Sequence, residues 1–138
     1  MQTAPAFPIR VFYDGSCSLC AREVERYGRM DRDGRLILVD ITAAGFDPVP
    51  YGITLAEFMY QMHVIDQSGA VFRGVEAFRA IWQAFPHSTL LGLSGVLISL
   101  PVANRLACIC YRLFARIRRF LPKRHTSCST GSCRIGKE

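Results

Sequence analysis

Two cysteines three positions apart, Cys17 and Cys20, lie in the octapeptide YDGSCSLC that spans residues 13–20. A pair at this spacing can exchange thiols with disulfides, and the same spacing occurs in zinc sites. If a helix begins near residue 17, both side chains lie on one face of it and the two sulfurs can approach each other. Which chemistry applies therefore depends on the elements that hold the pair.

The elements around the pair are predicted to be a strand, a tight turn and a helix. Residues 9–14 are rich in β-branched and aromatic side chains and end in Asp-Gly, which predicts a strand followed by a turn. Ser16 can then cap a helix over about 17–30. The apolar stripe of this helix consists of Cys20, Val24 and Tyr27. That stripe indicates which face of the helix packs on the core.

The following segments alternate between strands and helices. The unbroken apolar run at 36–39 predicts a strand buried on both faces, as in a parallel sheet. A capping box at Thr54 and Glu57 opens a short helix. A hairpin turns at 67–69, and a further helix covers 75–85. The order β-α-β-α-β-β-α predicts an α/β sandwich with mixed strand directions.

The position of the pair favours redox chemistry over zinc binding. A strand, a turn and a CxxC at the start of a helix, within a βαβ pattern, is typical of a thioredoxin-like redox site. Cys17 lies beside unpaired backbone N–H groups and the positive end of the helix dipole, which favour a thiolate. Cys20 lies one turn deeper, on the apolar stripe. We therefore expect Cys17 to be the accessible nucleophile and Cys20 to be the shielded thiol that resolves a mixed disulfide.

A structural zinc site is the alternative chemistry. It needs a second pair of ligands, and the candidates are Cys128 and Cys133, far along the chain. Both lie in 122–138, which has almost no apolar residues and is predicted to be a flexible tail. We interpret these two thiols first as incidental, then as a second redox pair that relays electrons, or as a metal clip with His125.

The motif and two later segments resemble one known family. The pattern YDGxCxxC resembles the signature of the thiol-disulfide oxidoreductase DCC family, whose Asp, Cys and Cys map onto Asp14, Cys17 and Cys20. The segments MHVIDQSGAVFRGVEAF and YRLFARIRR resemble that family's hairpin-plus-helix segment and its closing helix. The resemblance covers residues 9–121 and implies a thioredoxin-like fold and disulfide exchange on protein or small-thiol substrates.

Asp14 has two interpretations. The resemblance implies a carboxylate near the cysteines that takes or returns a proton during exchange. Turn chemistry alone would also account for it, because an Asp before Gly commonly bonds the backbone of such a turn. A carboxylate charge near Cys17 would oppose the effect of the helix dipole on that sulfur.

One departure from thioredoxins concerns the strand that faces the cysteines. Thioredoxins carry a proline, cis in the fold, just before that strand, whereas this chain has EFMYQMHVID without a proline. We expect Met62 or its neighbour to take that position. Substrates should therefore dock against the site differently.

Charge is distributed unevenly along the chain. The 138 residues carry a formal net charge of +6, and the segment 105–138 holds nine of the 17 basic residues against one acid. Residues 88–104 carry no charge, but glycine and proline interrupt them too often for a convincing membrane span. We expect them to cover the core of the domain.

A basic amphipathic helix is predicted over about 102–121. Its apolar stripe comprises Leu106, Ile109, Cys110, Leu113, Phe114, Ile117 and Leu121. Its basic face comprises Arg105, Arg112, Arg116 and Arg119. We expect the stripe to dock on the chain's own domain, and a membrane surface or protein partner for residues 88–121 is the alternative. The domain would then span 1–121, with 122–138 as its tail.

The remaining cysteines and histidines give weaker signals. Cys110 lies on the apolar stripe and is expected to be a small buried residue, whereas Cys108 should lie nearer the arginines. His63, in a predicted strand, is interpreted as structural. His87 follows a helix stop and indicates little.

Several function classes find no support in the sequence. It contains no phosphate loop, dinucleotide fingerprint or Ser-His-Asp order, and we expect no cofactor and no resident metal. The basic helix lacks interleaved aromatic residues for stacking on bases, so no nucleic-acid partner is expected. The N-terminal residues do not resemble a secretory signal, and we expect a cytoplasmic protein, with peripheral membrane contact as an alternative.

Overall fold

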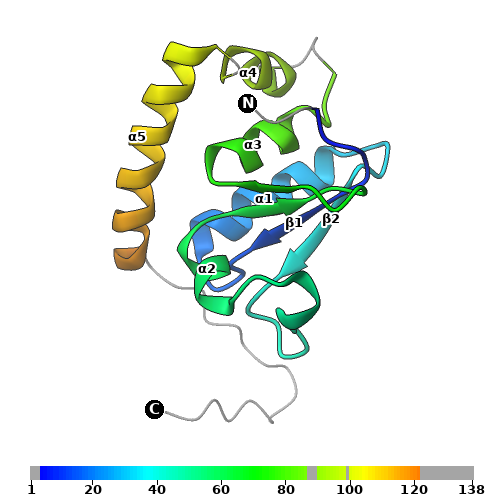
Figure 1. Ribbon diagram of the computed structural model, residues 1–138, viewed down its shortest axis with the longest axis vertical. Coiled ribbons are helices and arrows are strands. Elements are labelled where there is room, and N and C mark those ends of the chain that lie inside the picture. Colours follow the sequence, from blue (N-terminus) through cyan, green and yellow to red (C-terminus); the bar gives the residue numbers. More distant parts are fainter. Residues whose placement is uncertain (1–3, 87–89, 99, 122–138) are drawn as a thin grey trace.

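One mixed four-stranded sheet forms the centre of the protein (Figure 1). The computed structural model describes residues 4–86, 90–98 and 100–121. The strands, in the spatial order β2-β1-β3-β4, are β1 (Ile9–Tyr13), β2 (Leu36–Asp40), β3 (His63–Ile65) and β4 (Val71–Arg73). The helices are α1 (Ser18–Met30), α2 (Leu55–Tyr60), α3 (Val75–Trp82), α4 (Leu90–Ile98) and α5 (Pro101–Ile117), with short 3-10 helices η1 (Val49–Tyr51) and η2 (Arg118–Phe120). The predicted order β-α-β-α-β-β-α is confirmed, and α4 and α5 follow it.

The sheet has a core on each face. One core joins its strands to helices α1 and α3, and includes Ile9, Val11, Val24, Val64, Phe72 and Ile81. The other joins the sheet to α2 and the segment before it, and includes Phe12, Ile41, Ile53, Phe58 and Ile65. Strand β2 is parallel to β1, whereas β3 pairs antiparallel with both β1 and β4. The α/β sandwich with mixed strand directions is therefore confirmed, and its arrangement is thioredoxin-like.

Strand β2 differs from the prediction in its burial. Its parallel pairing with β1 is confirmed, but it is an edge strand with a neighbour on one side only. Ile37 is 43% exposed, so the prediction of a strand buried on both faces was wrong. An unbroken apolar run does not distinguish a central strand from an edge strand, because both need apolar residues on the face that packs against a helix.

Helix α5 packs against helices α3 and α4 (Figure 1). The face that it turns to the domain differs from the one that the sequence predicted. Most of the predicted apolar stripe faces outward: the exposed members are Leu106, Ile109, Cys110, Leu113 and Ile117. The half-buried residues are instead Ala103, Asn104, Ala107, Cys108, Tyr111, Phe114, Ala115 and Arg118. The helix therefore packs on its own domain as expected, but the prediction of its stripe, and of a buried Cys110, was wrong.

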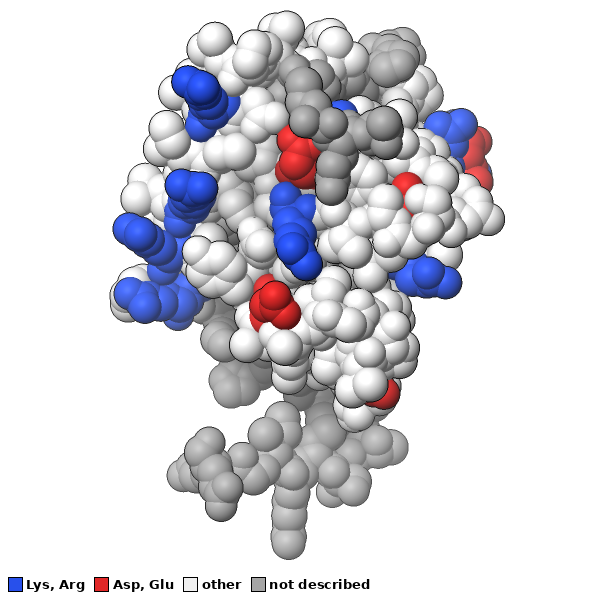
Figure 2. All heavy atoms as spheres, viewed as in Figure 1, with Lys and Arg blue, Asp and Glu red and all other residues white. Residues whose placement is uncertain are grey.

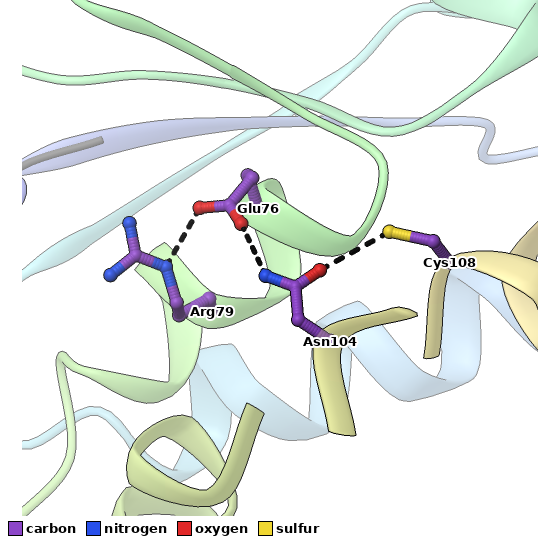
Figure 3. Close-up of polar contacts among 4 residues, drawn as sticks. All are labelled: Glu76, Arg79, Asn104 and Cys108. Carbon is purple, nitrogen blue, oxygen red and sulfur yellow. Dashed lines mark hydrogen bonds and ion pairs between the residues drawn. The ribbon is translucent and has the colours of Figure 1, made fainter. Parts of the chain in front are cut away.

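Polar bonds explain this choice of face (Figure 3). Asn104 of α5 donates from Nδ2 to Glu76 of α3 at 3.0 Å, and the Cys108 thiol donates to Asn104 Oδ1 at 3.2 Å. The same Glu76 carboxylate pairs with Arg79 Nε at 2.8 Å, and Arg79 is only 5% exposed. Buried polar groups need partners, so α3 pairs with the side of α5 that carries Asn104.

Several predictions fall outside the residues that the structure describes. They concern His87, His125, Cys128 and Cys133, and the tail at 122–138. Across the described ranges, no helix is both long and apolar enough to cross a membrane. The boundary between a domain at 1–121 and its tail stays a prediction.

Candidate functional site

Two carboxylates shape the loop between β1 and α1. Asp14 Oδ1 accepts hydrogen bonds from the backbone N–H of Ser16 at 2.9 Å and from the Ser16 hydroxyl at 2.5 Å. Asp40, at the end of β2, accepts a bond from the Gly15 N–H at 3.0 Å. A β-carbon on residue 15 would lie 2.0 Å from Asp40 Oδ2, so a larger residue there would displace the Asp40 carboxylate. Asp40 is therefore a positioning residue for the loop.

Helix α1 is capped by Cys17 itself. The helix begins at Ser18, and Cys17 Sγ accepts a bond from the Cys20 N–H at 3.4 Å. The prediction that Ser16 caps the helix was wrong, because the Ser16 hydroxyl is already bonded to Asp14. The capping bond directs the backbone N–H of Cys20 at the sulfur of Cys17. The cap thus places the Cys17 thiol at the N-terminus of α1.

The structure brings the two predicted cysteines together but reverses their exposure. Their Sγ atoms lie 2.7 Å apart, and both are free thiols. Cys17 is buried, with 6% exposure, whereas Cys20 is partly exposed. The expectation that Cys17 is the more accessible residue was wrong, because a capping side chain folds back over the first turn of its helix.

Cys17 nevertheless opens onto a cavity of about 280 Å³. We call this the arginine cavity, and its other lining residues are Asp14, Met59, Tyr60, Ala115, Arg116, Arg118, Arg119 and Leu121. They come from the β1–α1 loop, from the end of α2 and from the end of α5 with the residues that follow. A reactant in this cavity could reach Cys17 and would meet three guanidinium groups.

Cys20 borders a different cavity of about 230 Å³. We call this the apolar cavity, and its other lining residues are Leu19, Glu23, Val24, Met62, Phe78 and Phe114. Burial, followed by the hydrogen bond with Cys17 and the charge of Cys17, raises the pKa of Cys20 to about 12. The Arg118 charge lowers that pKa and the Asp14 charge raises it, both to a smaller extent. Cys20 therefore keeps its proton at neutral pH.

Met62, just before β3, lines the apolar cavity beside Cys20. This agrees with the expectation that Met62 or its neighbour replaces the proline of thioredoxins. The Met62 backbone N–H donates to the Tyr111 hydroxyl of α5 at 2.8 Å. Burial raises the pKa of Tyr111, so the hydroxyl stays protonated at neutral pH. The backbone N–H of Met62 is thus paired with a tyrosine of α5.

Asp14 has a visible structural role. Its side chain bonds Ser16, and its backbone carbonyl accepts from the Cys17 N–H at 3.1 Å. It also lines the arginine cavity together with Cys17. The turn interpretation therefore has direct geometric support, while proton transfer by this carboxylate stays a prediction.

Sequence reasoning missed Asp40 and Tyr111 as positioning residues. A signal for Asp40 existed, because it ends a strand predicted to be parallel to β1, and parallel strands bring their carboxyl ends to one edge. Tyr111 begins the segment YRLFARIRR that resembles the closing helix of the family, but that resemblance assigned it no contact. Its side chain is useful only because α5 turns it toward Met62, which the periodicity did not predict.

His63 is fully buried in β3, as expected of a structural histidine. Its Nδ1 lies 2.9 Å from the Gln61 carbonyl oxygen, whereas its Nε2 has no hydrogen-bond partner among the described residues. Burial lowers the pKa of His63 and keeps the ring neutral. Within the described part of the chain, no three His, Cys, Asp or Glu residues gather as a metal site would require.

Comparison with known proteins identifies the family. The model of the DCC1-like thiol-disulfide oxidoreductase family matches residues 11–124. An uncharacterised chloroplastic protein of Arabidopsis thaliana is 32% identical over 112 residues, which cover 80% of this chain and 50% of that protein. The chain thus spans about half the length of that relative. No solved structure matches the chain. The chain therefore belongs to the DCC1-like thiol-disulfide oxidoreductase family.

Proposed function

We propose that this protein is an enzyme that exchanges dithiols with disulfides, with Cys17 as the attacking thiolate and Cys20 as the resolving thiol. The observation that carries the proposal is the contrast between the two sulfurs. Cys17 caps α1 and opens onto a polar cavity, whereas the pKa of Cys20 is raised to about 12. Membership of the oxidoreductase family supports the same assignment.

The exchange proceeds in two balanced steps. The Cys17 thiolate attacks one sulfur of a substrate disulfide, which forms a mixed disulfide and releases the other sulfur as a thiolate. Cys20 then loses its proton and attacks Cys17 Sγ, which forms the Cys17–Cys20 disulfide and releases the second substrate thiol. Two electrons pass from the protein to the substrate. A dithiol or a pair of thiols returns them by the reverse reaction.

The second step needs a group that accepts the Cys20 proton. Asp14 is the acidic residue that lines the cavity beside Cys17, and its charge acts on Cys20. We infer that Asp14, directly or through a water, takes the Cys20 proton during the second step. Its bonds to Ser16 hold the carboxyl group in the loop that carries Cys17.

Mixed-disulfide trapping tests the assignment of roles. In a Cys20→Ser variant, reaction with a disulfide should stop at the first step and leave an adduct on Cys17. In a Cys17→Ser variant no such adduct should form at either position. Peptide mass spectrometry after acid quenching identifies which of the six cysteines carries the adduct. Adducts on Cys20 in preference to Cys17 would exchange the two roles.

A second candidate function is docking on an anionic membrane surface. Large apolar residues are exposed along α4, α5 and η2, and form what we call the C-terminal apolar surface: Leu90, Leu93, Val96, Leu97, Leu100, Val102, Leu106, Ile109, Leu113, Ile117 and Phe120. Exposed arginines at 105, 112, 116 and 119 lie on the same segment. Exposed apolar residues beside arginines suit the boundary between anionic headgroups and acyl chains.

Sedimentation with vesicles tests this second function. Vesicles that contain phosphatidylserine should bind the protein, and added salt should weaken the binding. Ile109→Glu should reduce it, whereas Val49→Glu, at a 79% exposed residue elsewhere, should not. Equal behaviour with neutral and anionic vesicles would exclude an anionic surface and leave a protein partner for residues 88–121.

The remaining predictions are part of the proposal. Substrates are thiol- or disulfide-containing proteins or small molecules, and the cytoplasm is the expected compartment. The plant relative is chloroplastic, and that location belongs to the relative alone. The zinc alternative is tested by metal analysis of protein purified without chelator, because a pair that is bound to zinc cannot cycle between thiol and disulfide.

A further inference from the structure

The arginine cavity continues into a second hollow of about 360 Å³ between the end of α2 and α5. The two share Tyr60, Ala115 and Arg116, and the second adds Gln61, Tyr111 and Arg112. We call the combined feature the α2–α5 groove. Sites of this size accommodate small molecules, whereas protein partners contact wider and flatter surfaces.

The α2–α5 groove is strongly basic. Among the described residues, its lining includes Arg112, Arg116, Arg118 and Arg119, against one acidic residue, Asp14. The ion pairs found within the described ranges are Arg35–Asp33 and Arg79–Glu76, so none of them neutralises these four arginines. Figure 2 shows basic side chains gathered along the edge that α5 occupies, with no acidic side chain among them.

Two bonds fix the arginines relative to Cys17. The Tyr111 hydroxyl accepts the Met62 N–H, and Asn104 donates to Glu76 (Figure 3). These bonds set the rotation of α5 about its own axis. As a consequence, the turns that follow Tyr111 carry Arg116 and Arg118 to the wall of the cavity onto which Cys17 opens.

We propose that the α2–α5 groove binds a low-molecular-weight thiol that carries carboxylates, or its disulfide, and presents the sulfur to Cys17. This inference rests on the proposed exchange function and names its substrate class. Guanidinium groups bind carboxylates through paired hydrogen bonds, and here they surround the approach to the reactive sulfur. They also stabilise the thiolate that leaves when Cys17 attacks an anionic disulfide.

The step itself is ordinary exchange. The Cys17 thiolate bonds to one sulfur of the anionic disulfide, the original S–S bond breaks, and the departing sulfur leaves as a thiolate beside the arginines. One sulfur–sulfur bond forms as another breaks, so the step needs no external oxidant or reductant. The groove therefore selects the substrate by charge and leaves the reaction at sulfur unchanged.

Three disulfides of similar size and different charge test the inference. The anionic one is 3,3'-dithiodipropionate, the neutral one is bis(2-hydroxyethyl) disulfide and the cationic one is cystamine. With the Cys20→Ser protein, mass spectrometry measures the rate of adduct formation on Cys17. We expect the anionic disulfide to react about tenfold faster than the neutral one and the cationic one to react slowest. Added salt should reduce these ratios.

Matched variants locate the effect. The double variant Arg116→Gln and Arg119→Gln should lower the ratio of anionic to neutral rates, because two of the groove cations are removed. Arg105→Gln removes a cation of the same helix that does not line the groove, and should keep the ratio. Thermal unfolding by circular dichroism verifies that each variant is folded.

The outcomes separate the two levels of the proposal. Equal rates for the three disulfides, or a faster cationic one, overturn the anionic substrate class but leave exchange at Cys17 intact. If no disulfide modifies Cys17 while alkylation shows that its thiol is available, the exchange function itself fails. A charge preference that Arg105→Gln also abolishes would assign the effect to net charge and not to the groove.

Discussion

The two sulfurs of the pair are 2.7 Å apart, yet they face different surroundings. Cys17 opens onto the arginine cavity, where three guanidinium groups and one carboxyl group line about 280 Å³. Cys20 borders the apolar cavity, whose lining is mostly aliphatic and aromatic. One turn of helix therefore separates a sulfur beside a polar cavity from a sulfur beside an apolar one.

The difference shows how a pair of identical groups acquires two roles. Charge on sulfur is favoured where donors and cations face it and disfavoured where apolar groups surround it. Helix α5 contributes to both walls, since Arg116 lines one cavity and Phe114 the other. The asymmetry of the pair thus depends on a helix that lies far from it in sequence.

Removing each sulfur in turn is the strongest test of this comparison. Cys17→Ser should lower the exchange rate by about a thousandfold or more, because the attacking atom is lost. Cys20→Ser should permit a first reaction and then stop. The reduction of a chromogenic disulfide under single-turnover and multiple-turnover conditions distinguishes these results. Equal loss in both assays for both variants would contradict separate roles.

The ionisation of Cys20 gives the next largest effect. With a pKa of about 12 instead of 9.0, its thiolate fraction at pH 8 should be about a thousandfold below that of an ordinary thiol. Iodoacetamide should therefore modify Cys20 very slowly, and the rate should keep rising above pH 9. The pH–rate profile of alkylation in Cys17→Ser measures this, because burial, the largest cause, persists in that variant.

The raised pKa of Cys20 also makes the free energy of unfolding depend on pH. The folded protein retains the Cys20 proton between pH 9 and pH 12, whereas the unfolded chain loses it. The free energy of unfolding should therefore decrease as pH rises above about 9, and part of that loss should be absent in Cys20→Ala. Urea unfolding at pH 7.5 and pH 10 compares the two proteins. An identical alkaline loss in Cys20→Ala would contradict the raised pKa.

Gly15→Ala tests the loop that carries Cys17. The added β-carbon would overlap the Asp40 carboxylate, so we expect a loss of about 2 to 3 kcal/mol in unfolding free energy together with slower exchange. Gly45→Ala is a matched control, since nothing lies within 4 Å of the corresponding β-carbon. Urea unfolding and adduct rates on Cys17 measure the two effects. An unchanged Gly15→Ala protein would show that Asp40 does not hold the loop.

Tyr111→Phe produces the smallest expected change. It removes the hydroxyl that accepts the Met62 N–H, which should cost about 1 to 2 kcal/mol of stability and loosen the wall between the two cavities. Alkylation of Cys20 should accelerate slightly as a result. Tyr60→Phe is the control for stability, because Tyr60 is 66% exposed. If both variants unfold alike, the bond to Met62 contributes nothing measurable.

Local patterns predicted most of the fold. The strand and helix at the motif, the capping box at Thr54 and the hairpin before α3 all follow from neighbours within a few residues. The predicted cysteine pair was also found together, because three positions along a helix bring two side chains to one face.

The errors have two physical causes. The exposure of Ile37 depends on which strands flank β2, and the exposed stripe of α5 depends on the polar groups that α3 presents. Cys17 is buried because Asp14 occupies the Ser16 hydroxyl and leaves capping to the cysteine sulfur. In the first two cases a contact far along the chain decided the outcome, whereas at Cys17 a competing hydrogen bond two residues away did.

The sequence by itself determined the order of the elements, the motif and the family resemblance, because these depend on residue types and short spacings. The tertiary structure alone decided what surrounds each sulfur. Arginines that are about a hundred residues beyond Cys17 line its cavity, and Tyr111 reaches Met62, since α5 packs against α3 and brings its C-terminal end to the site. Contacts at such separations depend on packing, and periodicity along the chain carries no information about them.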